Sequence, residues 1–330
     1  MSYVVAIDGG GTKTLAIIAK TDGEILEMST SGPSNIATLG LEKAREAIEE
    51  AYNSVLKKVG ASRYNVVAVC MGLAGLDSPR MLRSVRFAIR DWRLARIVRV
   101  EQDSTIALAA ATRLQEPGVI VIAGTGSVVM GTDGRGRIVK VGGWGYILDD
   151  EGSAFYIGYQ ALKLISKAFD GRIPRTRLLN YILQEFNARD YYELLEKIYK
   201  EEFSPINIGR IAPAVTKAAK EGDRVAISII NNAARELALM VTTALRRLGL
   251  RTAKVYYTGG VFAAGSLILD PFIRNIKRMY PQVEVQELPY QPVIGALYLA
   301  FQVARIELTP EVLSKIDESA KKFGLKGVTQ

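Results

Sequence analysis

The residues best suited to chemistry form a cluster near the start of the chain, directly after an apolar run. The run covers residues 4–7 and is followed by Asp8, Gly9, Gly10, Gly11, Thr12, Lys13 and Thr14. Adjacent glycines let backbone N–H groups approach a ligand that no Cβ obstructs. A row of N–H groups, two hydroxyls and an ammonium group suits a polyanion such as the phosphates of a nucleotide.

The residues after the glycines indicate which kind of phosphate loop this is. In a P-loop or a Rossmann loop the glycines lead into a helix. Here residues 15–19 read as a second strand, and Asp22-Gly23 reads as a hairpin turn into a third. The alternative is an ordinary hairpin, but such a turn needs one or two glycines rather than three followed by Lys. The pattern therefore predicts a glycine turn between two strands, with Asp8 at the strand end.

The same plan recurs later in the chain. Residues 118–123 read as a strand, then come Gly124, Thr125, Gly126 and Ser127, and residues 128–131 read as another strand. Both copies continue into the tripeptide Thr-Asp-Gly, at positions 21–23 and 132–134. A third glycine turn, Gly259-Gly260, follows the predicted strand 254–257. This repetition predicts two domains built on one pattern, whose two glycine hairpins grip a chain of phosphates.

Size and composition agree with a folded two-domain protein. The chain has 330 residues, of which 48% are hydrophobic and 23% are charged. We expect domains at residues 1–116 and 117–309, with a terminal helix over 310–323 packed on the first. We see no apolar run of membrane-spanning length, no signal peptide and a single cysteine, which together predict a cytoplasmic protein without a membrane partner.

Histidine is absent, so any general base must be a carboxylate, Lys, Tyr or the single cysteine. The formal charge of +9 suits anionic partners. Five arginines recur at helical spacing: Arg80, Arg83, Arg86, Arg90 and Arg93. Because no nucleic-acid-binding motif accompanies them, we interpret this face as solvated or as a subunit contact rather than as a nucleic-acid surface.

The surrounding periodicity predicts the elements that must position these residues. Helices are expected over residues 41–59, 79–92, 105–114, 154–169, 175–186, 191–199, 209–220, 223–248, 267–279, 293–304 and 310–323, and further strands over 25–26, 66–71, 97–100, 138–141 and 283–286. Asp103 follows one of these strands. From the residues alone it would be the N-cap of the helix that follows, a role that Ser104 would also fill.

Taken in order, these motifs resemble the sugar kinase–actin superfamily. Two further stretches, Gly142-Gly143-Trp144-Gly145 and Asp150-Glu151-Gly152-Ser153, are similar to those of the N-acetylglucosamine kinase and BadF/BadG/BcrA/BcrD ATPase family. The resemblance runs from Asp8 to Ala296. It implies an α/β chain with a two-lobed actin-like ATPase (ribonuclease H-like) fold, in which two related domains each hold a mixed sheet flanked by helices.

The resemblance also implies an activity, namely transfer of the γ-phosphoryl group of ATP to the 6-hydroxyl of a hexose or amino-hexose. The sugar would be N-acetylglucosamine, glucosamine or glucose. Asp103 would be the catalytic base, and Asp8 would hold Mg²⁺ through water. The phosphates would meet Gly10, Gly11, Thr12, Lys13, Thr14, Thr125, Gly126 and Ser127, and adenosine would meet Ala214, Gly259 and Gly260. The sugar would meet Asn35, Asp103, Thr125, Gly126, Trp144 and Asp150.

One position departs from the family pattern. Where the second loop of the family continues with Asn near the sugar, this chain has Val128. Because a site built to hydrogen-bond discriminates strongly, its loss leaves room for glucose or another hexose.

Two other functions stay open. The first is the ATPase arm of the family, which activates a reductase through an iron–sulfur cluster, but such a cluster needs several thiolates and Cys70 is alone. The second is a non-catalytic, sugar-sensing regulator, although relatives of that kind carry an added DNA-binding domain and this chain begins at its first strand. The resemblance further suggests a homodimer.

Overall fold

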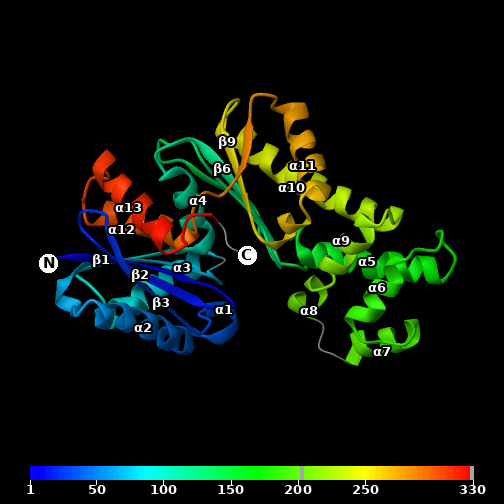
Figure 1. Ribbon diagram of the computed structural model, residues 1–330, viewed down its shortest axis with the longest axis horizontal. Coiled ribbons are helices and arrows are strands. Elements are labelled where there is room, and N and C mark those ends of the chain that lie inside the picture. Colours follow the sequence, from blue (N-terminus) through cyan, green and yellow to red (C-terminus); the bar gives the residue numbers. More distant parts are fainter. Residues whose placement is uncertain (77, 201–203, 328–330) are drawn as a thin grey trace. The chain divides into compact units, whose positions relative to one another are not determined.

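The computed structural model describes residues 1–76, 78–200 and 204–327, which form two compact units (Figure 1). Unit 1 contains Met1–Gly118, Thr132–Arg137 and the chain from Glu287 onward. Unit 2 contains Val119–Gly131 and Ile138–Gln286. We describe each unit by itself.

Unit 1 is built on a five-stranded sheet in the order β3-β2-β1-β4-β5. The strands are β1 (Tyr3–Gly9), β2 (Thr14–Lys20), β3 (Ile25–Ser31), β4 (Val66–Leu73) and β5 (Ile97–Gln102). β2 runs antiparallel to both β1 and β3, whereas β4 runs parallel to β1 and β5, so the sheet is mixed. The predicted hairpin of strands around the three glycines is therefore confirmed.

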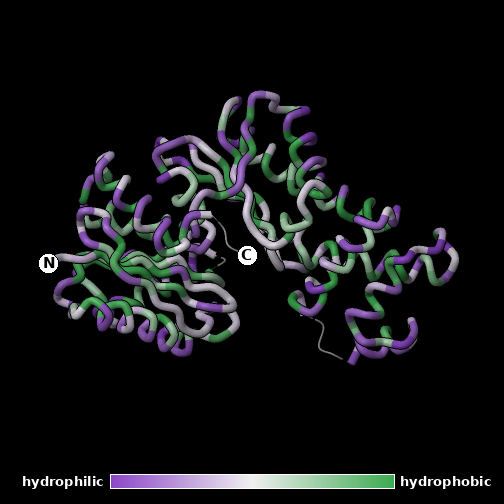
Figure 2. The backbone as a smooth tube through the Cα atoms, viewed as in Figure 1, coloured by the Kyte–Doolittle hydropathy of each residue, from purple (hydrophilic) through white to green (hydrophobic). Residues whose placement is uncertain are grey.

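Both faces of this sheet are buried, because the side chains of β1 alternate between two cores. Val5 and Ile7 belong to the core under α2 (Leu41–Lys58) and α3 (Pro79–Ala88). Val4 and Ala6 belong to the core under α4 (Asp103–Thr112), α12 (Pro292–Val303) and α13 (Pro310–Lys322). In Figures 1 and 2 the apolar strands of unit 1 lie between these helices, whose outer turns are hydrophilic. A short helix, α1 (Ile36–Leu39), precedes α2.

The C-terminal segment belongs to unit 1, and it starts earlier than the sequence indicated. We expected residues 117–309 in the second domain, but the chain from Glu287 packs with unit 1. α12 crosses α4 so closely that a Cβ on Gly295 would lie 1.8 Å from the carbonyl oxygen of Ile106. α13 continues on the same unit, where the Ser319 hydroxyl accepts the N–H of Ile25 at 3.0 Å.

Unit 2 repeats the strand order of unit 1. Its five-stranded mixed sheet, read from β8, runs β8-β7-β6-β9-β10. In each unit the strands therefore lie in the order third, second, first, fourth and fifth. The strands are β6 (Gly118–Ala123), β7 (Ser127–Thr132), β8 (Ile138–Gly142), β9 (Lys254–Thr258) and β10 (Glu284–Glu287). The helices are α5 (Ala154–Phe169), α6 (Leu178–Glu185), α7 (Tyr191–Lys200), α8 (Pro205–Gly209), α9 (Ala212–Lys220), α10 (Arg224–Leu248) and α11 (Ser266–Met279). The predicted two-domain pattern with related mixed sheets is confirmed.

The long helix α10 corrects our expectation that no apolar run reaches membrane-spanning length. By length and composition alone it qualifies as a membrane span. However, 56% of its most apolar window is buried inside the protein, where Ile229, Leu237 and Val241 pack in the core of unit 2. The core helix of a globular unit has the same composition.

Two predicted helices are interrupted. α3 ends at Ala88, and a 3₁₀ turn over Ile89–Trp92 leads to Arg93, whose φ is 49°. The five arginines therefore do not share one helix face. The helix expected over 209–220 is split into α8 and α9, because Pro213 lacks an N–H group and occupies the first turn of the second helix.

Candidate functional site

The first glycine loop joins β1 to β2, and three backbone hydrogen bonds hold its base. The Gly10 N–H donates to the Lys13 carbonyl at 3.0 Å and closes the turn. The Gly9 carbonyl accepts the Ala74 N–H at 2.8 Å, and the Gly10 carbonyl accepts the Ser34 N–H at 3.0 Å. Gly11, Thr12 and Lys13 are exposed at the tip of the loop.

Thr14 has a different position from the one we predicted. It is the first residue of β2, and its side chain is buried. Its hydroxyl forms hydrogen bonds of 2.7 Å with the Gly32 carbonyl and with the Ser34 hydroxyl. Thr14 thus anchors the loop to the segment after β3, and its hydroxyl is not presented to a phosphate.

Asp8 and Asp103 form a small acidic site in unit 1. Asp8 lies near the end of β1, and Asp103 is the exposed first residue of α4. The pKa of Asp8 is raised from its ordinary value of 3.8 to about 7, mainly by burial and also by the negative charge of Asp103, while the ammonium group of Lys13 acts in the opposite direction. The three side chains therefore lie near enough to influence one another.

The position of Asp103 is set by the packing of α4. A Cβ on Gly72 of β4 would lie 2.3 Å from the Cδ1 atom of Ile106, so α4 lies almost against the sheet. The N-cap of α4 is Gln102, and its side-chain amide donates to the Leu76 carbonyl. Asp103 is therefore not the N-cap, although one of its carboxylate oxygens accepts the neighbouring Ser104 N–H at 2.7 Å. A carboxylate at this helix N-terminus is favoured in its ionised form by the helix dipole.

Asn35 lies at the start of α1, close to the end of β4. Its side-chain oxygen accepts the Ala37 and Thr38 N–H groups at 3.0 and 3.3 Å, so it is the N-cap of α1. Gly75 approaches so closely that its Cβ would lie 2.4 Å from this oxygen. Asn35 is half-buried, and its amide nitrogen has no hydrogen-bond partner among the residues that the structure describes. A sugar hydroxyl could accept from that nitrogen.

The second glycine loop joins β6 to β7 in unit 2 and rests on the start of α5. The Gly124 N–H donates to the Gly126 carbonyl at 2.9 Å. The Gly124 and Thr125 carbonyls accept the Ala154 and Phe155 N–H groups at 2.8 and 3.2 Å. Because the first turn of α5 already holds the loop, those two N–H groups are not available to a phosphate. The Thr125 side chain is exposed.

Ser127 repeats the arrangement seen at Thr14. It is the first residue of β7, it is buried, and its hydroxyl donates to the Glu151 carbonyl at 2.8 Å. The predicted phosphate contact through this hydroxyl is therefore replaced by an anchoring role. The Ser127 N–H donates to the carboxylate of Asp150 at 3.1 Å, and a Cβ on Gly126 would lie 2.9 Å from the same carboxylate. Asp150 has a φ of 62°, which is uncommon for a residue other than glycine and typical of functional loops.

Trp144 is presented to solvent by the loop that follows β8. It is 61% exposed and therefore is not a core residue. The Lys140 Nζ lies 4.9 Å from the centre of its ring and donates to the Gly143 carbonyl at 3.0 Å. The Trp144 N–H donates to Asp149 at 3.3 Å. An exposed, positioned indole ring suits the apolar face of a sugar.

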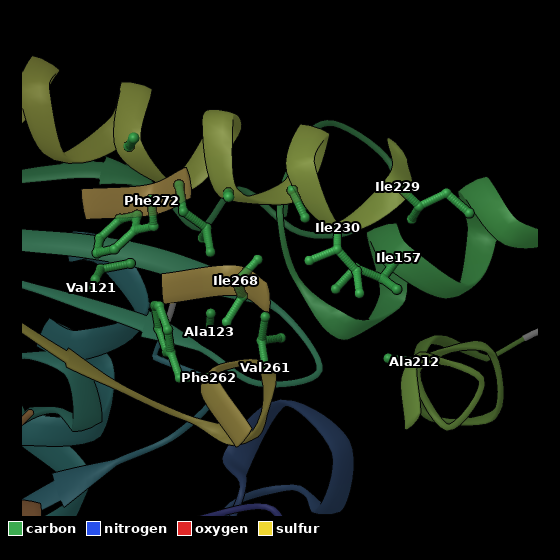
Figure 3. Close-up of a cluster of buried hydrophobic side chains, with 14 of the residues drawn as sticks. Val121, Ala123, Ile157, Ala212, Ile229, Ile230, Val261, Phe262, Ile268 and Phe272 are labelled. Carbon is green, nitrogen blue, oxygen red and sulfur yellow. The ribbon is translucent and has the colours of Figure 1, made fainter. Parts of the chain in front are cut away.

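A cavity of about 710 Å³ lies within unit 2 beside the second glycine loop. Gly124 and Thr125 form one side of it, and Gly260 and Val261 form another. Its walls are largely apolar, with cationic and hydroxyl side chains on α8–α9 and the segment joining them: Arg210, Thr216, Lys217 and Lys220. Figure 3 shows part of the apolar wall, including Ile157, Ile230, Val261 and Ile268, with Ala212 from α9. A cavity of this size and character suits a nucleotide.

Two of the residues predicted to meet adenosine do not line this cavity, and three cationic residues that we did not predict do. Ala214 is buried and does not line the cavity, whereas its neighbours Ala212 and Pro213 do. Gly259 does not line it either. Its φ is 107°, and a Cβ there would lie 2.3 Å from the Ala123 carbonyl oxygen, so it is needed for packing. The cations Arg210, Lys217 and Lys220 were missed, because no motif in the sequence marks the side of α9 that faces the cavity.

At four positions, neither the backbone conformation nor the packing within the chain requires glycine. Gly11, Gly32, Gly124 and Gly260 have no positive φ, and a Cβ on any of them would meet no atom within 4 Å. Three of these four lie in the three predicted nucleotide loops. Close approach of a ligand to the backbone explains a glycine where neither conformation nor packing does.

The acidic site of unit 1 fits a magnesium ion. Mg²⁺ prefers oxygen ligands and keeps most of its water molecules. Asp8 and Asp103 supply carboxylate oxygens, and the raised pKa of Asp8 reflects a site where a cation would be favoured. No group of three or more acidic, cysteine or histidine side chains lies together in the ranges covered by the structure, so an ion bound here would keep water ligands.

Known proteins resemble this chain along most of its length. The sequence profile of the BadF/BadG/BcrA/BcrD ATPase family matches residues 5–300. The N-acetylmuramic acid/N-acetylglucosamine kinase of Clostridium acetobutylicum is 34% identical over 302 residues, which cover 91% of this chain and 98% of that relative. The N-acetyl-D-glucosamine kinase of Dictyostelium discoideum is 29% identical over 308 residues, which cover 90% and 97%.

The solved structures bear on the fold. A candidate N-acetylglucosamine kinase from Chromobacterium violaceum has a TM-score of 0.74 at 24% identity, and the match covers 91% of this chain and 99% of that one. The actin-like kinase fold predicted from the motifs is confirmed. With its profile match, its relatives and its fold in agreement, the chain belongs to the BadF/BadG/BcrA/BcrD ATPase family.

Proposed function

We propose that this protein is an ATP-dependent carbohydrate kinase that transfers the γ-phosphoryl group of ATP to a hexose or amino-hexose, at the 6-hydroxyl. The sugar kinases among its relatives support the reaction class. The observation that carries the proposal is the exposed carboxylate of Asp103 at the start of α4, beside Asp8 and the first glycine loop.

Asp103 is the general base. Its carboxylate accepts a hydrogen bond from the sugar hydroxyl, orients the oxygen and takes the proton as the oxygen attacks the phosphorus atom. The chain contains no histidine, so an imidazole cannot take this role.

The first glycine loop holds the phosphate that is transferred. Gly10, Gly11 and Thr12 offer backbone and hydroxyl donors, and Lys13 stabilises the negative charge that develops during transfer. Asp8 holds Mg²⁺ through water, and the bound ion would neutralise phosphate charge. Thr125 and Gly126 of the second loop contact the phosphates from unit 2.

The cavity in unit 2 binds the nucleoside. Its apolar wall, which includes Val261 and Ile268, takes the adenine ring, and Gly260 lets the base approach the backbone. Lys217 and Lys220 on α9 supply positive charge at the rim. Domain closure would exclude water and so limit ATP hydrolysis.

The sugar contacts that the family resemblance implies are Asn35 and Asp103 in unit 1, and Trp144 and Asp150 in unit 2. Val128 is a specificity residue in this proposal. It is half-buried and close to the Gly143 backbone, where a built Cβ would lie 2.9 Å from it, so it places an apolar wall next to the Trp144 loop. Such a wall cannot hydrogen-bond an acetamido group, and we expect glucose and glucosamine to be accepted beside N-acetylglucosamine.

The reductase-activating function is disfavoured by the one cysteine. Cys70 is buried in β4, and burial raises its pKa to about 12, whereas cluster ligands are thiolates. The regulator, the homodimer and the cytoplasmic location remain untested predictions.

The direct test is a coupled assay of ADP release with ATP, Mg²⁺ and four sugars: glucose, glucosamine, N-acetylglucosamine and N-acetylmannosamine. We expect at least one sugar to raise ADP release well above the rate with ATP alone. Asp103→Asn should lower kcat by roughly 10²- to 10⁴-fold, while nucleotide affinity measured by calorimetry stays within about twofold. Asp22→Asn, an acidic residue on the hairpin between β2 and β3, is the matched control and should leave kcat unchanged. If no sugar raises ADP release, the kinase is excluded, and if Asp103→Asn retains turnover, the base is another residue.

A further inference from the structure

Two of the five arginines that the sequence analysis singled out, Arg86 and Arg90, line a second cavity that the proposed reaction does not use. It has a volume of about 390 Å³ and lies in unit 1 at β5, the edge strand of the sheet. Three guanidinium groups line it, from Arg86, Arg90 and Arg99, together with one carboxylate, from Glu101. The remaining lining is apolar, from Ile89, Val98, Val100 and Val303. The four charged side chains give the lining a net charge of +2.

Two of the guanidinium groups are held in place by the protein. Arg86 donates from Nε to the Val100 carbonyl at 2.9 Å and from a terminal nitrogen to Glu101 at 3.0 Å. Arg99 donates from Nε to Glu101 at 2.8 Å and from a terminal nitrogen to Gln302 of α12 at 2.9 Å. Each uses two of its five N–H groups in this way, so three remain for a ligand. The Glu101 side chain is only 12% exposed and serves as the fixed point between them.

Arg90 is oriented differently from these two. It forms no ion pair with any residue in the described ranges, and its guanidinium group lies 5.8 Å from the centre of the Phe87 ring. Its positive charge is therefore not neutralised locally. Because Glu101 neutralises only one of the three arginines, the cavity holds positive charge that the protein leaves uncompensated.

We propose that this cavity is a second binding site, distinct from the kinase site, for a small phosphomonoester such as a phosphorylated sugar. Fixed guanidinium forks match the oxygen geometry of a phosphate group better than any other side chain. The apolar residues at the cavity wall suit the C–H face of a small carbon skeleton, and the volume lies within the range of ligand pockets. The site depends on charge and shape alone, so it stands whether or not the protein transfers phosphate.

The alternative is an extended basic surface for a polyanion. Such a surface would use exposed arginines of α3 that do not line the cavity, above all Arg83. The cavity hypothesis predicts that binding depends on Arg90, whereas the surface hypothesis predicts that it also depends on Arg83. Arg83→Met is therefore the matched control for Arg90→Met.

The test is isothermal titration calorimetry of the full chain with glucose 6-phosphate and with inorganic phosphate. We expect glucose 6-phosphate to bind more tightly than inorganic phosphate. Arg90→Met, which removes no hydrogen bond within the described ranges, should weaken glucose 6-phosphate binding by about tenfold or more. Arg99→Lys keeps the charge but loses the fork and should weaken it by a similar factor. Arg83→Met should stay within about twofold, and thermal melts should show that all three variants fold.

Three outcomes would overturn the proposal. Equal weakening by Arg83→Met would indicate a polyanion surface. If Arg90→Met and Arg99→Lys bind glucose 6-phosphate with unchanged affinity, the ligand binds at the kinase site and not in this cavity. If glucose 6-phosphate and inorganic phosphate bind with equal affinity, the cavity recognises only the phosphate anion and not a phosphomonoester.

Discussion

In unit 1 the loop between β1 and β2 has a carboxylate at its base, Asp8, and an ammonium group at its tip, Lys13. In unit 2 the corresponding loop between β6 and β7 has the sequence Gly-Thr-Gly-Ser and carries no charge. It borders a cavity of about 710 Å³ instead. The difference suggests a division of labour, in which unit 1 supplies the charges for chemistry and unit 2 supplies the shape for recognition.

The two loops nevertheless share one anchor. In each, the first residue of the second strand carries a buried hydroxyl that ties the loop to a neighbouring segment. Thr14 binds the Gly32 carbonyl and Ser34, and Ser127 binds the Glu151 carbonyl. The scaffold has thus been kept in both units while the exposed residues differ, and each of these statements can be tested by substitution.

The largest effect should come from removing the charge at the tip of the first loop. We expect Lys13→Met to lower kcat by roughly 10²- to 10³-fold, because in the proposed mechanism the ammonium group stabilises charge that develops during transfer. Thr125→Val, the matched change in the uncharged second loop, should lower kcat by about tenfold or less. Steady-state kinetics on the best sugar would measure both. Equal losses in the two variants would contradict the division of labour.

The next effect concerns pH and the acidic base of the first loop. The pKa of Asp8 rises from 3.8 to about 7 on folding. The folded protein therefore binds more protons than the unfolded chain between these values, and its stability falls as pH rises through this range. Asp8→Asn abolishes this titration, so the variant should gain stability relative to wild type from pH 4 to pH 7, and the gain should level off above pH 8. We expect about 2 kcal/mol, less than the full shift would give, because Asp8 is partly exposed.

Urea unfolding of the metal-free protein at a series of pH values would measure this gain. Asp22→Asn is a control of opposite sign. The hydrogen bond from Lys315 holds the pKa of Asp22 below its usual range, so Asp22 stabilises the fold above that range and loses this contribution as the pH falls. A stability difference between Asp8→Asn and wild type that does not change with pH would contradict the shifted titration.

The smallest effects should come from the two anchors. Thr14→Val and Ser127→Ala each remove a buried hydrogen bond and should cost about 1 to 2 kcal/mol of unfolding free energy. Because neither hydroxyl faces a ligand, the KM for ATP should change by less than about threefold. Thr14→Ser keeps the hydroxyl and should recover much of the stability. If the KM for ATP rises strongly while the unfolding free energy stays the same, Thr14 and Ser127 contact the phosphates after all.

Much of this fold could be read from local patterns in the sequence. The glycine hairpin, the second copy of its plan and α5 over residues 154–169 all follow from periodicity and turn chemistry. Asp103 was singled out by the family resemblance, and the absence of histidine is compatible with a carboxylate base. These features depend on neighbouring residues only, so one sequence is enough to find them.

The remainder depended on contacts between distant residues. Nothing near Thr14 or Ser127 in the sequence indicates that its hydroxyl meets Ser34 or the Glu151 carbonyl. The assignment of α12 to unit 1 depends on how Gly295 meets Ile106 of α4. The cationic rim of the large cavity depends on which side of α9 faces inward. By contrast, Pro213 was a visible signal for the start of α9 that we did not use.

Cys70 lies within β4, and its side chain is inaccessible to solvent. Burial raises its pKa to about 12, so at neutral pH almost no thiolate forms and thiol reagents find nothing to attack. It is also the only cysteine in the chain. A thiol engineered onto the surface would therefore be chemically unique, and a pair of them, one on each unit, would accept a donor and an acceptor dye without a background label. The buried native cysteine therefore does not need to be replaced before fluorescence measurements of motion during turnover.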